Sequence, residues 1–222
     1  MTDLAERESH QAPTAVHERA KRTVDVVLSS ALIIITAPLL LLLCLLVPLT
    51  SAGPALFRQE RLGLHKQPLT LLKLRTMRAG NDDRIHRDYV TSLLSGDPPV
   101  PAGRDRLFKL DADPRITRVG AWLRRSSMDE LPQLINVLRG EMSLVGPRPV
   151  LAWEAELFGD PYQQRFSVKP GITGLWQVSG RSRLSFREAL ELDIEYVMRR
   201  SFLLDLIILV RTVPALFGGG AG

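Results

Sequence analysis

Two adjacent carboxylates, Asp129 and Glu130, follow Arg124 and Arg125 within a few residues. A carboxylate that stays ionised beside arginines can attack phosphorus and form an acyl-phosphate. A diphosphate would repel it, because each pair of like unit charges at 4 Å costs about 1 kcal/mol in water and about 4 kcal/mol at an effective dielectric constant of 20. Such chemistry needs cations, which we expect from arginines and from Mg²⁺, an ion that prefers carboxylate and phosphate oxygens.

The same residues have a purely structural interpretation. Ser127 precedes Glu130 by three residues, which is the spacing of a capping box at the start of a helix. Asp129 would then only interact favourably with the positive end of the helix dipole. The local pattern by itself does not decide between a helix cap and a reactive pair.

Three further segments are candidates for binding an anionic ligand. Arg148 lies between two prolines, and a guanidinium on a rigid turn suits bidentate contact with phosphate, although a solvated arginine would fit the same turn. Lys73 and Arg75 form a basic pair that a solvated surface would also explain. Residues 169–174 contain two glycines that permit close approach of the backbone to a ligand, although a plain tight loop is the simpler interpretation.

Several common kinds of site are excluded. The sequence contains no G-x-x-x-x-G-K-[ST], no G-x-G-x-x-G and no H-E-x-x-H. A single cysteine, Cys44, excludes an intramolecular disulfide and a C-x-x-C site. The four histidines fall in polar or tail segments, so acid–base work must fall to carboxylates.

An apolar segment near the N-terminus predicts that the chain is attached to a membrane. From Val26 to Leu49 there is no charged side chain, and much of the segment is Leu, Ile and Val. A helix of this length reaches about 36 Å, more than the roughly 30 Å of the hydrocarbon layer. A cleavable signal peptide fits poorly, because the preceding charged region is too long and no A-x-A-like site follows. Hydrophobicity on all faces also disfavours a buried core helix in so small a protein.

Pro38 lies in the middle of this segment. Proline clashes with the carbonyl four residues before it, here that of Ile34, so we expect a kink, with Thr36 near enough to bind the freed carbonyl. Basic residues flank both ends, and the positive-inside tendency keeps both ends in the cytoplasm. A re-entrant hairpin with halves of about 18 Å satisfies both flanks. A kinked helix that spans the bilayer remains the alternative.

Periodicity and turn signals outline four further segments: a short strand or helix at 69–75, a loop or loosely ordered insertion at 78–106, and helical patterns at 128–138 and 184–198. Gly140 is a plausible stop for the helix at 128–138. Residues 201–217 are apolar but are interrupted by charges and a proline, which fits either a helix in the membrane interface or a core helix.

Taken together, the motifs resemble those of the bacterial sugar transferases, which are monotopic polyprenyl-phosphate phosphoglycosyltransferases. The resemblance covers nearly the whole chain from about residue 19, with the motifs in the order of the family. These motifs are Lys21–Asp25, Lys73–Met77, Asp113–Gly120, Ser127–Gln133, Met142–Pro149, Lys169–Arg181 and Leu192–Tyr196. Their joint specificity favours the reactive pair over the helix cap at Asp129 and Glu130.

The resemblance implies a mainly α fold with little strand, in which a Pro-kinked re-entrant membrane helix joins a small cytoplasmic catalytic domain with interfacial amphipathic helices. We expect a flexible tail at 1–18, the membrane hairpin at 19–50 and the catalytic domain at 51–222. The kink here is at Ala37 and Pro38, where a Ser-Pro pair is common in the family, and 78–106 matches poorly. Longer members carry extra N-terminal spans and a soluble domain, so this chain is expected to be the minimal form.

The resemblance also implies an activity. Such enzymes transfer a sugar-1-phosphate from a UDP-sugar to undecaprenyl phosphate at the cytoplasmic face of the bacterial inner membrane, as the first membrane step of exopolysaccharide, O-antigen or glycoprotein glycan assembly. Asp129 would be the nucleophile that forms a covalent phosphosugar intermediate and releases UMP, with Mg²⁺ beside it. Glu130 would assist deprotonation of the acceptor. Substrate contacts would come from Arg124, Arg148, Lys73, Arg75, Lys169 and Arg181.

A net charge of +5 is compatible with a second class of protein, a non-enzymatic membrane-anchored adaptor whose basic face binds anionic lipid. Such an adaptor has no need of a carboxylate pair in a cationic setting. Aromatic residues make up only 6% of the chain and do not interleave with the basic ones, which argues against nucleic acid as a partner. The sequence leaves open which sugar is used, which glycan follows and whether the chain forms a homo-oligomer.

Overall fold

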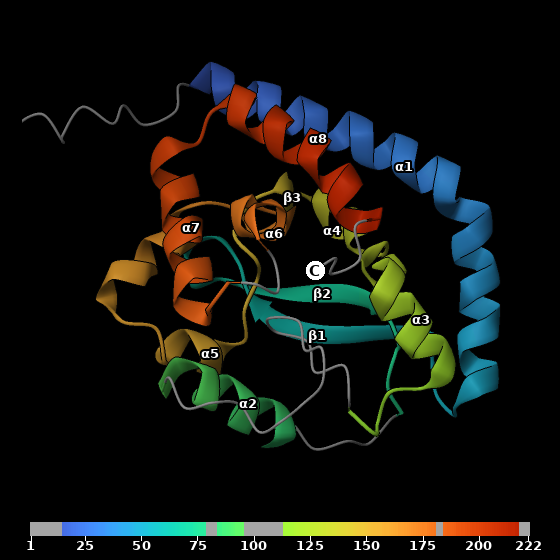
Figure 1. Cartoon of the computed structure of the whole chain (residues 1–222). Helices are drawn as coiled ribbons and strands as arrows, with labels where there is room; N and C mark the ends of the chain where they lie inside the picture. Colours follow the sequence, from blue (N-terminus) through green and yellow to red (C-terminus); the bar gives the residue numbers. More distant parts are fainter. Residues whose placement is uncertain (1–14, 79–83, 96–112, 181–183, 218–222) are drawn as a thin grey trace, which may run out of the picture.

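A computed structural model describes residues 15–78, 84–95, 113–180 and 184–217 of the chain (Figure 1). The fold is mainly α with little strand, as predicted. In chain order its elements, with 3₁₀ helices written η, are α1 (Ala15–Thr50), β1 (Leu56–Leu62), η1 (Leu64–Lys66), β2 (Pro68–Leu74), α2 (Arg84–Ser95), α3 (Arg118–Ser126), η2 (Met128–Glu130), α4 (Gln133–Arg139), β3 (Ser143–Val145), α5 (Ala152–Glu156), η3 (Asp160–Ser167), β4 (Gly171–Thr173), α6 (Leu175–Ser179), α7 (Phe186–Arg199) and α8 (Phe202–Phe217).

Helix α1 is long and apolar enough to cross a membrane, and only 11% of its most apolar window is buried. The helix starts within the predicted tail and contains Pro38 and Pro48, and it changes direction partway along the edge of the molecule (Figure 1). Thr36 Oγ1 donates a 2.7 Å hydrogen bond to the carbonyl of Leu32. The predicted partner, the carbonyl of Ile34, is therefore wrong, because a helical hydroxyl reaches the carbonyl four residues before its own.

Strands β1 and β2 form an antiparallel hairpin in which Leu56 pairs with Leu74 and Leu62 pairs with Pro68. The segment at 69–75, which fitted strand or helix, is thus a strand. Its neighbours Leu71 and Leu72 are both buried although they point to opposite faces of the ribbon. Because β2 is covered on both faces, its sequence lacks the alternation that distinguishes a strand from a helix.

The helix predicted over 128–138 is divided into η2 and α4. Pro132 stands between them, and its ring nitrogen cannot donate the hydrogen bond that would continue a helix through this point. Helix α4 ends at Gly140 with φ 80°, which confirms the predicted stop. Each piece can therefore point in its own direction, and η2 carries the two carboxylates.

Two other predictions concern helices α7 and α2. Helix α7 confirms the helical pattern at 184–198, and a capping box between Ser185 and Glu188 starts it. The loop predicted at 78–106 is wrong for the residues that form α2. There Val90 is fully buried in a hydrophobic cluster with Phe158 and Phe186, so a tertiary contact stabilises a helix within a largely polar segment.

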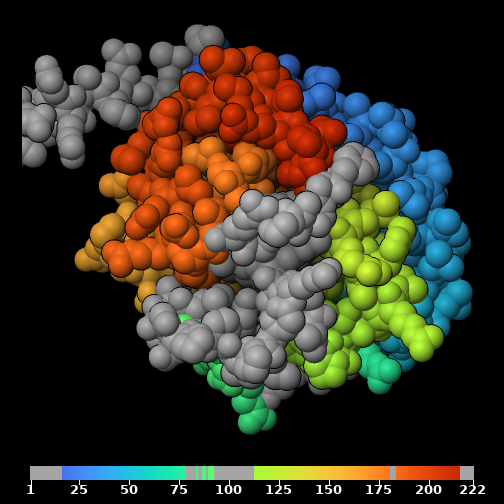
Figure 2. All heavy atoms as spheres, viewed as in Figure 1, coloured from blue at the N-terminus to red at the C-terminus, as the bar shows by residue number. Residues whose placement is uncertain are grey.

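Helix α8 lies against α1 at the edge of the molecule (Figures 1 and 2). Its inward side carries Asp205 and Ile208, both buried. Its other side exposes large apolar side chains, namely Phe202, Leu203, Leu206, Ile207, Val210 and Val213. The two alternatives for 201–217 are thus combined, because α8 packs on the domain and also presents an apolar surface of the kind found at membrane interfaces.

Candidate active site

Ser127 forms the turn that precedes the two carboxylates. It adopts the left-handed conformation, with φ 57° and ψ 16°, and its backbone N–H closes the end of α3. A capping residue at a helix start has extended dihedral angles instead, and the Ser127 side chain makes no cap hydrogen bond. The capping-box interpretation of Ser127 and Glu130 is therefore wrong.

The side chain of Glu130 lies between two cations. Its Oε1 atom is 3.4 Å from Lys73 Nζ and 3.6 Å from Arg148 Nη1, and all three side chains are 13–15% exposed. Lys73 comes from β2, Glu130 from η2 and Arg148 from the turn after β3, so three segments distant in sequence meet here. Asp129, the next residue to Glu130, is 3% exposed. The structure therefore joins Glu130 to two of the six basic residues predicted to contact substrate.

Asn136, which sequence reasoning missed, fixes α4 against the strand that carries Lys73. Its Oδ1 accepts from the Leu72 N–H at 3.1 Å, and its Nδ2 donates to the Thr70 carbonyl at 2.7 Å and to Glu141 Oε2 at 2.6 Å. The side chain is fully buried, so these hydrogen bonds satisfy polar atoms that water cannot reach. The signal that could have revealed it is a lone Asn on the apolar face of a predicted helix.

The turn that carries Arg148 packs backbone to backbone against the loop at 169–174. Gly171 N donates to the Pro147 carbonyl at 2.9 Å, and Gly146 N donates to the Thr173 carbonyl at 2.9 Å. A Cβ on Gly171 would lie 2.1 Å from the Gly146 nitrogen, closer than real Cβ atoms come to other atoms. These glycines therefore allow the backbones of two chain segments to come into contact, and Gly171–Thr173 form strand β4 and not a plain loop.

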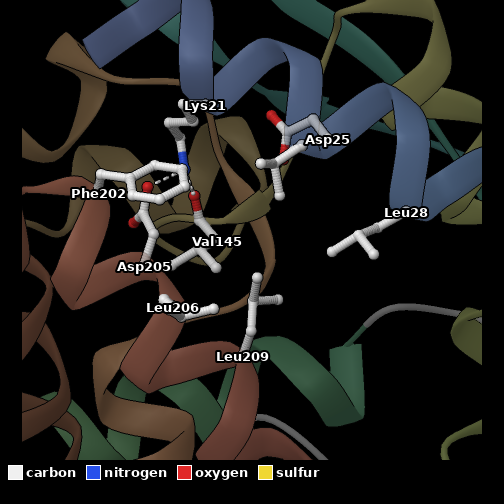
Figure 3. A pocket seen from close by; sticks show the side chains of 9 residues that line it. Lys21, Asp25, Leu28, Val145, Phe202, Asp205, Leu206 and Leu209 are labelled. Carbon is white, nitrogen blue, oxygen red and sulfur yellow. Dashed lines mark hydrogen bonds and ion pairs between the residues drawn. The ribbon is translucent and has the colours of Figure 1, made fainter.

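The N-terminal part of α1 is bonded to the domain by Lys21. Its Nζ lies 2.8 Å from Asp205 Oδ2 on α8 and 3.0 Å from the Val145 carbonyl (Figure 3). Tyr196 also donates to Asp205, at 2.7 Å. Burial raises the pKa of the Tyr196 hydroxyl well above its ordinary value, and the Asp205 charge adds to this, so the hydroxyl remains a donor. Lys21, expected from sequence to be a flanking charge, thus ties α1 to α8.

Two neighbours of Lys21 complete this attachment. Arg22 donates to the carbonyls of Val137 and Leu138 at 2.6 and 2.7 Å, at the end of α4. Asp25 Oδ1 accepts from the Leu144 N–H at 2.9 Å, just before the turn that carries Arg148. The direction of α1 is consequently fixed relative to the candidate active site.

A cavity of about 70 Å³ lies between α1 and α8 beside Lys21 (Figure 3). Its walls are largely apolar, with Leu28 on one helix and Leu209 on the other. Neither Asp129 nor Glu130 lines it. The cavity is therefore separate from the candidate active site.

Other predicted contact residues lie elsewhere. Arg75 is buried and donates to the carbonyls of Ser51 and Ala52 at 2.6 Å, just beyond α1. Lys169 Nζ is 3.7 Å from the position of a Cβ on Gly140, at the opposite end of α4 from the carboxylates. Arg181 lies outside the described residues. Their roles in substrate binding stay predictions.

Arg124 lies in the last turn of α3, close enough to influence Asp113. Burial by itself would raise the pKa of Asp113, but hydrogen bonds from Arg115 at 2.6–2.9 Å outweigh it. The pKa of Asp113 therefore lies below its ordinary value, and the charge of Arg124 contributes to this. The predicted role of Arg124 at the substrate is not tested by this contact.

The carboxylate pair fits Mg²⁺ only if a ligand completes the coordination. Within the described residues no three His, Cys, Asp or Glu side chains cluster as a metal site. Mg²⁺ characteristically binds through one or two carboxylates together with substrate phosphates and water. Asp129, the ligand predicted from the sequence, would hold Mg²⁺ in such a shared site, in which a diphosphate would supply further oxygens.

The structure thus brings together a buried aspartate and a glutamate held by two cations, in a domain bonded to a long apolar helix. The chain belongs to the bacterial sugar transferase family, whose sequence model matches residues 16–219.

Several relatives are similar over most of the chain. The exopolysaccharide production protein ExoY of Sinorhizobium fredii is 40% identical over 196 residues, which are 88% of this chain and 84% of ExoY. The undecaprenyl-phosphate galactose phosphotransferase of Salmonella typhimurium is 41% identical over 192 residues, 86% of this chain but only 39% of that relative. The UDP-glucose:undecaprenyl-phosphate glucose-1-phosphate transferase of Caulobacter vibrioides is 41% identical over 212 residues, 92% of this chain and 72% of that protein. The chain thus spans well under half the length of some relatives.

Proposed function

We propose that this chain transfers a sugar-1-phosphate from a UDP-sugar to undecaprenyl phosphate and releases UMP. The observation that carries the proposal is the placement of Glu130 between Lys73 and Arg148, directly beside the buried Asp129. The names of the Salmonella and Caulobacter relatives state such transfers to undecaprenyl phosphate, of a galactose and a glucose phosphate group respectively. A membrane-anchored adaptor has no need of this arrangement.

The transfer takes place in two displacements. An oxygen of Asp129 attacks the β-phosphorus of the UDP-sugar, an Asp–O–P bond forms, and the bond from that phosphorus to the oxygen of UMP breaks. A phosphate oxygen of undecaprenyl phosphate then attacks the same phosphorus and displaces Asp129, while Glu130 accepts the proton of the acceptor. Lys73 and Arg148 offset the negative charge of the diphosphate. Mg²⁺, when bound at Asp129, would supply further charge neutralisation.

The arrangement of the helices supports this reaction at a membrane surface. The phosphate of a polyprenyl phosphate lies at headgroup level, so the site must lie near the interface. Helices α1 and α8 lie together and expose apolar side chains, and Lys21, Arg22 and Asp25 hold α1 to the domain. We place the catalytic domain on the cytoplasmic face of the inner membrane, with α1 as a re-entrant hairpin.

Release of UMP without a lipid acceptor tests the proposed reaction. The purified full-length chain in detergent with Mg²⁺ is mixed with UDP-glucose, UDP-galactose or a UDP-acetamidohexose, and UMP is measured over time. We expect one UDP-sugar to give a rapid release of UMP equal to the enzyme concentration, because the covalent intermediate forms once and then waits. UMP that appears only after undecaprenyl phosphate is added would contradict the two-step mechanism. An adaptor would release none in either case.

The position of the N-terminus distinguishes a re-entrant helix from a spanning helix. In a Cys44→Ser background, Ser9→Cys and Arg187→Cys each provide a single thiol for a membrane-impermeant maleimide. We expect neither thiol to react in intact spheroplasts and both to react after permeabilisation, because a hairpin keeps both ends on one side. Reaction of Ser9→Cys alone in intact spheroplasts would show a spanning helix and overturn the re-entrant topology.

A further inference from the structure

Arg165 and Asp193 form a buried ion pair behind the turn that carries Arg148. Arg165 Nη2 lies 2.7 Å from Asp193 Oδ2, and the two side chains are 2% and 3% exposed. The same nitrogen donates to the Arg148 carbonyl at 2.8 Å. The guanidinium also lies over the rings of Phe158 and Phe166, 5.1 and 5.7 Å from their centroids. A rigid, buried cation is thus bonded directly to the backbone of Arg148.

The turn depends on contacts of this kind. Pro147 and Pro149 have no N–H, so the carbonyls of the turn are its main means of attachment. Gly171 N binds the Pro147 carbonyl at 2.9 Å and Arg165 binds the Arg148 carbonyl. The hydrogen bond to its carbonyl restrains the backbone of Arg148 and so restrains the direction in which the Arg148 side chain points. Arg165 therefore helps to determine whether the Arg148 side chain reaches Glu130.

Stability alone does not explain the ion pair. Among the described residues, Arg165 Nη1 and Asp193 Oδ1 have no hydrogen-bond partner, although both are buried. Burial raises the pKa of Asp193 to about 6 against the opposing charge of Arg165, and burial lowers the pKa of Arg165. Incompletely bonded buried pairs can be replaced by apolar side chains without loss of stability. An apolar pair could therefore serve stability equally well, but it could not bind the Arg148 carbonyl as Arg165 does.

We propose that Arg165 and Asp193 are positioning residues for the transfer reaction, which hold the Arg148 turn so that the guanidinium of Arg148 stays beside Glu130 and the diphosphate. This proposal rests on the proposed function. Arg165 itself touches neither the carboxylate pair nor solvent. Its effect on the reaction passes through Arg148.

The test separates stability from activity with an apolar replacement of the pair. Arg165→Met alone leaves Asp193 buried without its cation, and we expect the unfolding temperature to fall by about 10 °C. Arg165→Met with Asp193→Leu should return it to within a few degrees of the parent chain. The rate of the UMP burst at saturating UDP-sugar should nevertheless stay about 10- to 100-fold low in the double variant, since small misplacements of a catalytic group cost this much. Arg187→Met, whose side chain is 80% exposed, is the matched control and should change neither quantity.

A double-mutant cycle with Arg148→Ala tests whether the effect passes through Arg148. If it does, the paired replacement should slow the burst in the parent chain but have little further effect in an Arg148→Ala background. Equal slowing in both backgrounds would overturn the proposal, as would a stable double variant with the parent burst rate. Failure of the proposed function is distinguishable, because the parent chain itself would then give no UMP burst.

Discussion

Asp129→Asn is expected to abolish the release of UMP that precedes addition of the lipid acceptor, with a loss of at least about 1000-fold in rate. The amide has nearly the same shape as the carboxylate, so the buried position of Asp129 can still be filled. It lacks the negative oxygen that attacks phosphorus, so no covalent intermediate can form. Quenched-flow measurement of UMP, with intact-protein mass spectrometry of the denatured enzyme, follows both products of the first step. The parent chain should gain the mass of one sugar phosphate, and the variant should not.

Two controls accompany this variant. Asp160→Asn makes the same change at an exposed position outside the site and should leave the burst unaltered. Glu130→Gln should preserve a burst, though a slower one, and should mainly reduce turnover once undecaprenyl phosphate is present, because Glu130 serves the acceptor. A burst of parental size in Asp129→Asn would show that the nucleophile is another residue.

Gly171→Ala is expected to destabilise the fold by at least about 3 kcal/mol, at the upper end of the cost of inserting a methyl group into a packed interior. The new Cβ would lie 2.1 Å from the Gly146 nitrogen and 2.5 Å from the Thr173 carbonyl oxygen. Both are backbone atoms, which cannot move away as the end of a flexible side chain can. The parallel pairing of β3 and β4, in which Ser143 lies opposite Gly171, must therefore open.

Denaturant unfolding in detergent, followed by tryptophan fluorescence, measures this loss. Gly159→Ala is the matched control, because its nearest atom would be 3.7 Å from the new Cβ and its φ of −64° suits alanine. Its stability should change by less than about 0.5 kcal/mol. Equal stabilities of the two alanine variants would show that the backbones at Gly146 and Gly171 are far enough apart to admit a methyl group. Any Gly171→Ala protein that folds should also lose transfer activity, because the displaced turn carries Arg148.

The sequence by itself determined the features that depend only on residues close together in the chain. The uncharged run from Val26 to Leu49 predicts a membrane helix at any tertiary arrangement, because its apolar length alone exceeds the bilayer core. The stop at Gly140 and the helix at 184–198 follow equally from neighbouring residues. The order of motifs was sufficient to predict the family.

The tertiary structure decided which of these residues meet. Lys73 reaches Glu130 from 57 positions away and Arg148 reaches it from the other direction, whereas Arg75, only two residues from Lys73, turns to the end of α1. Residues two apart share one face of a strand, but β2 ends at Leu74, so Arg75 lies beyond the strand and its guanidinium binds the carbonyls of Ser51 and Ala52. The sequence does not show where the strand ends or which segment packs against each side chain. Ser127 likewise ends α3 and does not cap η2, because its left-handed backbone conformation closes α3 and its side chain makes no cap hydrogen bond to η2. The residue types therefore predicted the chemistry of the site. Which residues form the site was decided by contacts between segments far apart in the chain.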